Sequence, residues 1–407
     1  MGGRAAMSEE ELGTSVPQDN GDAAQAPADV AEAAEVLQEE EAPKSPLAET
    51  TRQWVSLPGS SCNVRIGSGN LENFGHDLKS SVGKPAKAAL LVSDKADPDF
   101  VQKLLWQLND AGFQALRGSV PGELTLSAAD ELFGELDRLH ITSDDLIVCV
   151  GAAPELSLVL YAAGAWCGRT PVCALPLDLE ALVCATVTPE GISVGTHRDM
   201  VSGHNSLKNV FADFARIDLG PSEKRLHAYA TMVATAVSDT EKAFEALYNR
   251  RDALAEADEV ALREQVNETL RSRGRIASST SVAVRQSLSY GVTFAEALSH
   301  LVEGVPASTL LAEGLRFTAR VAVTEEDFKV DDMLAQDELL SVLGLGTVSA
   351  TVDPDALLHE MRACAHLRSN RFMLAVPRAF GRVRLATIED ARLKAHLEAW
   401  CAQHQAD

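Results

Sequence analysis

Apolar residues recur with two different spacings along the chain, and the change between them divides the sequence. Between residues 52 and 219, short apolar runs such as 88–94 and 146–150 alternate with stretches in which apolar residues recur every three or four positions. The runs are typical of buried parallel strands, and the stretches are typical of amphipathic helices. Strands that alternate with helices predict a doubly wound, Rossmann-like parallel sheet.

Two local signals add detail to this part of the chain. Ser127 precedes a helical pattern and has Asp130 three positions later, which predicts a capping box at the start of that helix. Cys184–Thr188 and Ile192–Thr196 are joined by a Pro-Glu-Gly turn. This arrangement predicts a β-hairpin attached to the sheet.

From about residue 220 the helical spacing dominates. Helices are predicted over 222–239, 240–257, 260–273 and 293–302, and strand signals return only at 371–376 and 382–386, which predict a late hairpin. The expected fold class is therefore α/β. A Rossmann-like domain over 52–219 precedes a mainly α-helical domain over 220–407.

The first 51 residues differ from the rest in composition. Residues 1–50 contain 12 acidic and two basic residues and no aromatic residue. Such a segment cannot bury enough apolar area to offset the entropy lost on ordering. We therefore predict that 1–51 is a disordered acidic tail that serves solubility, with a docking arm as the alternative.

The charge of the whole chain excludes several function classes. With 36 basic and 59 acidic residues, the net charge is −23, which disfavours binding to nucleic acid and to anionic membranes. The chain has no window of 18 uninterrupted apolar residues and no signal-peptide pattern. Seven cysteines without a Cys-x-x-Cys pair argue against a structural zinc site and favour a reducing, cytoplasmic location.

Four segments together suggest a family. They are Val150-Gly151, Gly168–Pro176, Leu207–Phe211 with the expected closing strand Ile217–Leu219, and the stretch from Arg285 to Phe294. Their order resembles the glycine-rich turn, the strand before a Pro-Thr-Thr motif, the Gly-Lys-Asn segment and the Arg…Asn-x-Gly-His-Thr-Phe stretch of 3-dehydroquinate synthases. The superfamily also includes glycerol dehydrogenase and iron-containing alcohol dehydrogenases. The resemblance covers residues 62–385.

This resemblance implies a site between two domains that holds NAD and a divalent metal, usually zinc. The family enzyme acts in the shikimate pathway of aromatic amino acid biosynthesis. NAD transiently oxidises a hydroxyl of a phosphorylated sugar acid, phosphate is eliminated, and the ring of 3-dehydroquinate closes. The metal polarises the hydroxyl and ketone oxygens, while basic groups hold the substrate's phosphate and carboxylate.

The positions that match the family's metal ligands do not carry metal-binding side chains. The Glu position reads Thr231, the first His position reads Val292, and the second His position lies near Ala307. Valine and alanine have no lone pair to donate, and a single threonine is a poor ligand for a divalent metal. Glu296 and His300 share a helix face and are an alternative site for a shifted metal, unless they form only a solvated face.

The dinucleotide side is altered as well. The family's glycine-rich turn reads Gly151-Ala152-Ala153-Pro154-Glu155, and its Pro-Thr-Thr motif reads Pro176-Leu177-Asp178. Pro154 lacks an N–H donor, and Glu155 places an anion where the dinucleotide phosphates would lie. We therefore expect neither NAD nor zinc to bind in the family's usual mode.

Five positions keep the family residue. Gly151 and Glu123 are the weak matches on the cofactor side, and Lys208, Asn209 and Arg285 are the remaining catalytic candidates. We expect Lys208 and Arg285 to face each other across the interdomain cleft and to hold a small anion. In the alternative, Lys208 caps a loop and Arg285 pairs with an acid on a neighbouring helix.

These observations leave three hypotheses for the function. The first is a 3-dehydroquinate synthase-like protein with a degenerate site, a non-catalytic or regulatory paralogue. Its expected partners are a small anionic ligand in the cleft and either a second copy of the chain or a catalytic paralogue. The second is an active 3-dehydroquinate synthase whose site is relocated or misaligned. The third is an unrelated two-domain α/β protein.

Overall fold

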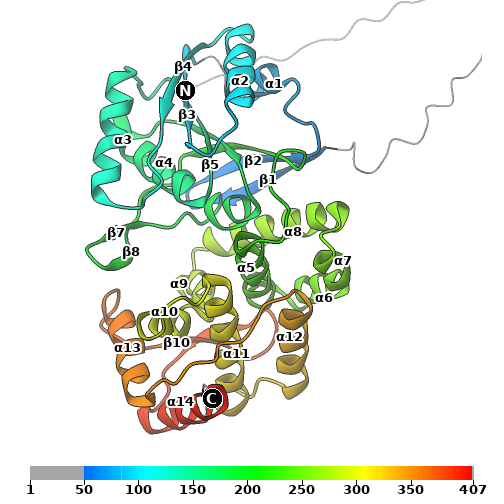
Figure 1. Ribbon diagram of the computed structural model, residues 1–407, viewed down its shortest axis with the longest axis vertical. Helices are drawn as coiled ribbons and strands as arrows, with labels where there is room; N and C mark the ends of the chain where they lie inside the picture. The colour runs from blue at the N-terminus through cyan, green and yellow to red at the C-terminus, as the bar shows by residue number, and fades with distance from the viewer. Residues whose placement is uncertain (1–49, 84, 406–407) are drawn as a thin grey trace, which may run out of the picture. The chain divides into compact units, whose positions relative to one another are not determined.

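The computed structural model describes residues 50–83 and 85–405, which belong to one compact unit (Figure 1). The predicted acidic tail over 1–51 therefore lies outside the described residues, except for its last two positions. The first strand already begins at Thr51. Within the described part of the chain, no helix is long and apolar enough to cross a bilayer.

A seven-stranded sheet forms the N-terminal half and confirms the predicted Rossmann-like fold class. Its strands are, in spatial order, β1 (Thr51–Leu57), β2 (Ser60–Gly67), β9 (Leu207–Asp213), β6 (Val172–Pro176), β5 (Leu146–Gly151), β3 (Lys87–Val92) and β4 (Gln114–Ser119). All neighbouring strands pair in parallel except β1, which runs antiparallel to β2. The parallel pairing brings the carboxyl ends of these strands to one edge.

Helices cover both faces of the sheet because successive residues of a strand point to opposite sides. They are α1 (Phe74–Val82), α2 (Pro98–Asp110), α3 (Leu126–Arg138) and α4 (Ala153–Ala165), followed by the short 3-10 turn η2 (Trp166–Gly168). Leu90 of β3 packs with α1 and α2 in one apolar cluster, whereas Leu91 packs with α3 and α4 in another. The sheet is therefore buried on both sides (Figure 1).

Two local expectations in this half are wrong. Helix α3 is capped by Thr125, whose Oγ1 accepts from the Ala128 N–H at 3.1 Å, so Ser127 lies inside the helix and is not its cap. The segment around Cys184 is not a strand but a π-helical turn, η3 (Ala181–Ala185). It forms because an Asp178 carboxylate oxygen accepts from the Ala181 N–H at 2.8 Å and begins the turn.

The hairpin and the closing strand are consequently shifted along the chain. The antiparallel pair consists of β7 (Ile192–Val194) and β8 (His197–Val201). The closing strand of the sheet is β9, whereas the expected strand Ile217–Leu219 contributes only an isolated bridge between Asp218 and Asp178. β9 has a continuous buried run from Asn209 to Asp213, which fits a central strand between two parallel neighbours.

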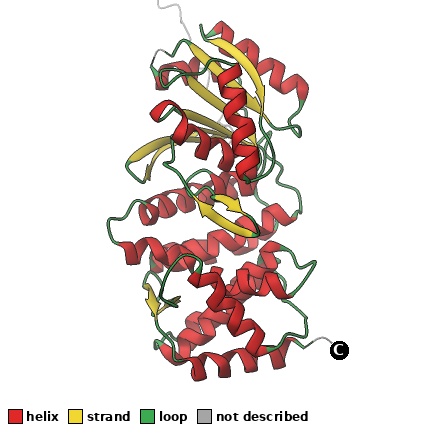
Figure 2. Cartoon of the chain, turned by 90° about the vertical axis from the view of Figure 1, so that its left-hand side faces the viewer, coloured by secondary structure: helices red, strands yellow, loops and turns green. Residues whose placement is uncertain are grey.

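The C-terminal half is mainly helical, as predicted (Figure 2). Its helices are α5 (Glu223–Asp239), α6 (Glu241–Asn249), α7 (Arg251–Ala255), α8 (Glu259–Ala277), α9 (Val282–Arg285), η4 (Gln286–Ser289), α10 (Val292–Leu301), α11 (Ala307–Glu325), α12 (Val330–Val342), α13 (Pro354–His366) and α14 (Asp390–His404). The predicted late hairpin is confirmed as β10 (Leu374–Pro377) paired with β11 (Val383–Ala386). The predicted helix over 240–257 is two helices, α6 and α7.

A close backbone approach joins α10 and α11. Gly291 precedes α10 with a φ of +79°, and a Cβ atom on Gly314 of α11 would lie only 2.0 Å from the Gly291 carbonyl oxygen. Real Cβ atoms do not tolerate such a distance. Gly314 is therefore required for these two helices to pack at this separation.

We predict that Gly314→Ala destabilises the protein by about 1–3 kcal/mol, because the added methyl group forces the helices apart. The matched control is Gly134→Ala in α3, where nothing lies within 4 Å of the added atom. That control should be neutral or stabilising by up to about 1 kcal/mol. Urea unfolding of both variants measures the difference. Equal stability of Gly314→Ala and the wild type would contradict the close approach.

Candidate functional site

A cavity lies at the carboxyl edge of the sheet, where open α/β sheets bind their ligands. It has a volume of about 320 Å³ and is lined by Lys95, Asp97, Phe100, Ala152, Leu177, Asp178, Arg216, Asp218 and Lys224. These residues follow β3, β5, β6 and β9 or belong to the first turns of α2 and α5. The parallel register of the strands is what brings them together.

The cations of this cavity are paired with acids of the chain itself. Lys224 forms an ion pair with Asp178, and Arg216 lies 3.7 Å from Asp97. Burial alone would lower the pKa of Lys224, but the hydrogen bond and the charge of Asp178 outweigh it and hold the pKa above its ordinary value. The Arg216 guanidinium also lies 4.8 Å above the Phe100 ring. The charges of this cavity are therefore balanced internally.

Glu155 lies at the helix start, where the sequence predicts an anion in place of the dinucleotide phosphates. Its side chain is 2% exposed in the first turn of α4, where backbone N–H groups and the helix dipole favour an anion. One carboxylate oxygen, Oε1, accepts from Ser93 Oγ at 2.9 Å and lies 3.9 Å from Lys95 Nζ. The other, Oε2, is buried and has no hydrogen-bond partner among the described residues.

The retained glycine of the turn now accommodates this carboxylate. A Cβ atom on Gly151 would lie 2.8 Å from the Glu155 Cβ, so only glycine allows the side chain to enter here. Glu123, the other retained residue on the cofactor side, is exposed in the loop after β4. The residues present at this turn do not fit a pyrophosphate, because a buried carboxylate already occupies the helix start.

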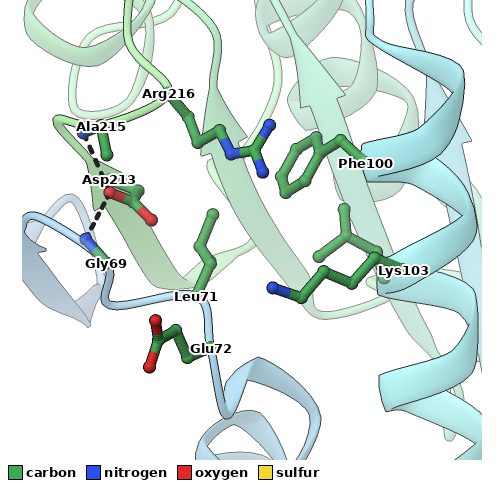
Figure 3. Close-up of a pocket in the computed structure, with 9 residues that line it drawn as sticks. Gly69, Leu71, Glu72, Phe100, Lys103, Asp213, Ala215 and Arg216 are labelled. Atoms are coloured by element: carbon green, nitrogen blue, oxygen red, sulfur yellow. Dashed lines mark hydrogen bonds between the residues drawn. The ribbon is translucent and has the colours of Figure 1, made fainter.

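A smaller cavity of about 180 Å³ lies beside the first and shares Phe100 and Arg216 with it (Figure 3). Asp213, at the end of β9, accepts from the backbone N–H groups of Gly69 at 2.8 Å and Ala215 at 3.0 Å. Lys103 and Glu72 line the same space with opposite charges. This cavity is thus also of mixed charge.

An arginine with only neutral acceptors lies where η3, α5 and α8 meet. Arg273 donates from Nε and Nη2 to Thr188 Oγ1 at 3.0 and 2.6 Å, and from Nη1 to Thr235 Oγ1 at 3.0 Å. Burial lowers its pKa, and in the described part of the chain no carboxylate lies within ion-pair distance of it. Nearby, the Cys184 thiol donates to Thr231 Oγ1 at 3.3 Å, and burial raises the pKa of this thiol to about 12.

The sequence pattern did not reveal Arg273. The predicted helix ended at residue 273, which would have placed the arginine on an exposed helix end. Helix α8 instead continues to Ala277, so Arg273 lies within the helix between the buried positions Ser272 and Gly274. No feature of the sequence distinguishes it from the neighbouring Arg271 and Arg275, which are exposed.

The three positions that match the family's metal ligands do not form a donor set. Thr231 is buried and its hydroxyl accepts from Cys184, Val292 is 41% exposed at the start of α10, and Ala307 is exposed at the start of α11. Ser308, next to Ala307, donates through both its N–H and its hydroxyl to Glu223 at 2.7 Å. A divalent metal would find one hydroxyl oxygen here, so these residues do not fit the family's metal.

The alternative metal residues have separate partners. Glu296 pairs with Arg368 at 3.0 Å, whereas His300 lies 3.2 Å from Glu360 of α13. Glu296 and His300 therefore each pair with a different residue of the C-terminal half.

The remaining catalytic candidates lie in three separate environments. Lys208 is exposed at the start of β9, the sheet edge opposite Gly151, and Asn209 is buried beside Asn63 in the ladder. Arg285 donates to the carbonyls of Ser279 at 2.6 Å and Thr280 at 3.3 Å rather than to an acid. Within the described ranges, no hydrogen bond or ion pair joins Lys208 to Arg285. That they face each other across a cleft remains a prediction.

The sequence was compared with known proteins. No family model matches the chain. The 3-dehydroquinate synthases of Synechococcus sp. and Prochlorococcus marinus are each 22% identical to it, over 347 and 367 residues. The alignments cover 81% and 85% of this chain and 92% and 97% of those proteins.

The chain resembles the 3-dehydroquinate synthases. Solved structures share its fold. A 2-deoxy-scyllo-inosose synthase complexed with carbaglucose-6-phosphate, NAD+ and Co2+ has a TM-score of 0.70 at 15% identity, covering 86% of this chain and 100% of its own. A 2-epi-5-epi-valiolone synthase from Streptomyces hygroscopicus with NAD+ and Zn2+ bound has a TM-score of 0.70 at 12% identity, covering 86% and 99%.

An iron-containing alcohol dehydrogenase from Thermotoga maritima is also similar, with a TM-score of 0.59, 14% identity and coverage of 87% of this chain and 100% of its own. These likenesses show the fold of the dehydroquinate synthase-like superfamily. They agree with the resemblance expected from the order of the four sequence segments.

We predict that Glu155→Gln lowers the free energy of unfolding by about 1–2 kcal/mol, because it removes the anion at the start of α4. The control is Glu131→Gln, an exposed glutamate of α3, which should change stability by less than about 0.5 kcal/mol. Denaturant unfolding at two salt concentrations provides the measurement, and the effect should persist in high salt because Glu155 is buried. A neutral Glu155→Gln would mean that this carboxylate does not stabilise the helix start.

Proposed function

We propose that this chain is a non-catalytic, regulatory protein with the 3-dehydroquinate synthase-like fold, and that it binds a small anion instead of NAD, the family's catalytic metal and the family substrate. The observation that carries this proposal is the buried Glu155 carboxylate in the first turn of α4. A helix start that is already neutralised by its own chain repels the phosphates of a dinucleotide.

The neighbouring loop supports the same conclusion. Where the family has two threonines, this chain has Leu177 and Asp178, and Asp178 holds both the Ala181 N–H and Lys224. A dinucleotide would have to displace this ion pair and also approach Glu155. Two carboxylates on adjacent strand ends therefore oppose an anionic cofactor.

The positions that match the family's metal ligands support a loss of catalysis, independently of the dinucleotide turn. The family reaction needs a Lewis acid that polarises the hydroxyl to be oxidised, which is worth several kcal/mol in the transition state. Thr231, Val292 and Ala307 supply one hydroxyl oxygen between them. No other group at these positions replaces that polarising charge.

Arg273 is the best candidate for holding the anion. A guanidinium has five N–H groups, of which the contacts to Thr188 and Thr235 use three. The remaining two suit a phosphate or carboxylate oxygen, and a half-buried arginine without an acid gains from such a partner. In a chain of net charge −23, an anion needs a local cation of this kind. Lys208 and Arg285, the pair that the sequence offers, are the second candidate.

The regulatory role implies a partner. We propose that the chain acts as a homodimer or beside a catalytic paralogue in the cytoplasm, where the ligand of the paralogue would also be present. All seven cysteines are free, which suits a reducing compartment.

We predict that NAD at about 1 mM produces no saturable heat in calorimetry and that the chain does not rescue a strain lacking 3-dehydroquinate synthase. A catalytic synthase such as that of Synechococcus serves as the positive control in both assays. Micromolar NAD binding together with rescue would overturn the proposal and favour an active synthase with a relocated site.

We predict further that inorganic phosphate raises the thermal midpoint of the wild type and leaves that of Arg273→Met unchanged, because a ligand stabilises only the state that binds it. Arg271→Met, an exposed arginine of the same helix, should respond to phosphate like the wild type. Loss of the response in both variants would indicate non-specific screening, and an unchanged response in Arg273→Met would place the anion elsewhere.

A further inference from the structure

Three side chains of different metal-binding types converge between α10 and α13, outside the site described above. His300 lies in the last turn of α10, and Glu360 and Cys364 lie one helical turn apart on α13. The His300 Nδ1 is 3.2 Å from Glu360 Oε2 and 3.8 Å from Cys364 Sγ. All three candidate ligand atoms lie within 4.8 Å of one another.

These separations match a single four-coordinate cation. Zinc lies about 2.0–2.1 Å from nitrogen, about 2.0–2.2 Å from a carboxylate oxygen and about 2.3 Å from sulfur. Tetrahedral angles then separate the nitrogen from the oxygen by about 3.4 Å and from the sulfur by about 3.6 Å. The observed 3.2 and 3.8 Å each differ from these values by about 0.2 Å. Both separations measured from His300 Nδ1 therefore suit one bound cation, and the third pair, a Glu360 oxygen and the Cys364 sulfur, lies within 4.8 Å.

The two helices hold these ligands in place. Glu360 and Cys364 are four residues apart, so both side chains lie on the same face of α13. On the core side of that helix, Leu357 and Met361 are fully buried, and the Asp353 side chain caps its first turn. Ligands carried on packed helices keep their geometry better than ligands on loops.

The charges around the thiol favour a cation. The carboxylates of Glu296 and Glu360 both lie near the Cys364 thiol, and the charge of Arg368 opposes them. The charge of Arg368 is taken up by Glu296 at 3.0 Å. A divalent cation would displace the thiol proton, and the thiolate with the Glu360 carboxylate would then balance its two positive charges.

We propose that His300, Glu360 and Cys364 bind one zinc-type divalent cation whose fourth position is open to water or a small ligand. The nitrogen, oxygen and sulfur donors suit zinc or cobalt rather than magnesium or calcium, which take oxygen ligands. The side chains of His300 and Glu360 are 40% and 29% exposed, so water reaches the fourth position. His300 is eight residues beyond Val292, about 12 Å along α10, so this site is not the family's metal position.

Cobalt titration of the metal-free full chain tests the proposal, because cobalt reports a bound thiolate by a charge-transfer absorption band. We expect saturation at about one Co2+ per chain with such a band, and displacement of the cobalt by Zn2+. Cys364→Ser should abolish the band. His300→Ala should weaken cobalt binding by more than about 100-fold, because removing a residue that only supports a ligand already lowers metal affinity by about 10–100-fold, and removing the ligand itself costs more.

Two variants serve as controls. Cys167→Ser removes the exposed cysteine outside the cluster, and Thr231→Val removes the hydroxyl at the family's metal position; both should bind cobalt like the wild type. Thermal unfolding without metal verifies that every variant is folded, and the half-exposed His300 makes His300→Ala the safer test. The proposal is overturned if the wild type shows no saturable band, or if the band survives in folded Cys364→Ser and His300→Ala. Because no NAD is present, this result is independent of the proposed function.

Discussion

The start of α4 favours an anion, and in this chain that anion is the buried carboxylate of Glu155. A parallel sheet necessarily brings the loops after its strands to one edge, and the helix that follows β5 presents its unpaired N–H groups there. In Rossmann-like sheets, a helix start at this edge commonly binds the phosphates of a dinucleotide. Here the absence of a side chain at Gly151 lets Glu155 enter, and Ser93 and Lys95 hold its carboxylate. In the cavity beside this carboxylate, Lys224 is likewise paired with an acid of the chain.

The surroundings of Arg273 have the opposite charge character. Where the helices meet η3, the chain has hydroxyls, a protonated thiol and one arginine, with no acid at ion-pair distance of Arg273 among the described residues. Buried acids therefore lie at the strand ends, whereas none lies at ion-pair distance of Arg273 among the described residues. Under the proposed function, both features act against the same reaction, so the fold persists without the family's chemistry.

Features that depend on neighbours in sequence could be predicted, and those that depend on distant contacts could not. The buried runs around Leu90 and Val148 identify central strands because a parallel strand is apolar along its whole length. The turn at Ala181–Ala185 was missed because it depends on Asp178, which is itself held by Lys224, 46 residues away. Cys364 and His300 are 64 residues apart, and nothing in either local sequence indicates that they meet.

The pairing of charges at the strand ends also constrains the evolutionary history open to this protein. Replacement of Glu155 alone leaves the Ser93 hydroxyl without its acceptor and the start of α4 without an anion. Replacement of Asp178 alone leaves the Lys224 ammonium and the Ala181 N–H unpaired. Under the proposed function, a lineage that regained cofactor binding one substitution at a time would therefore pass through proteins less stable than either end of the path. Selection for stability alone would then keep the divergence in place long after any reason for it had gone.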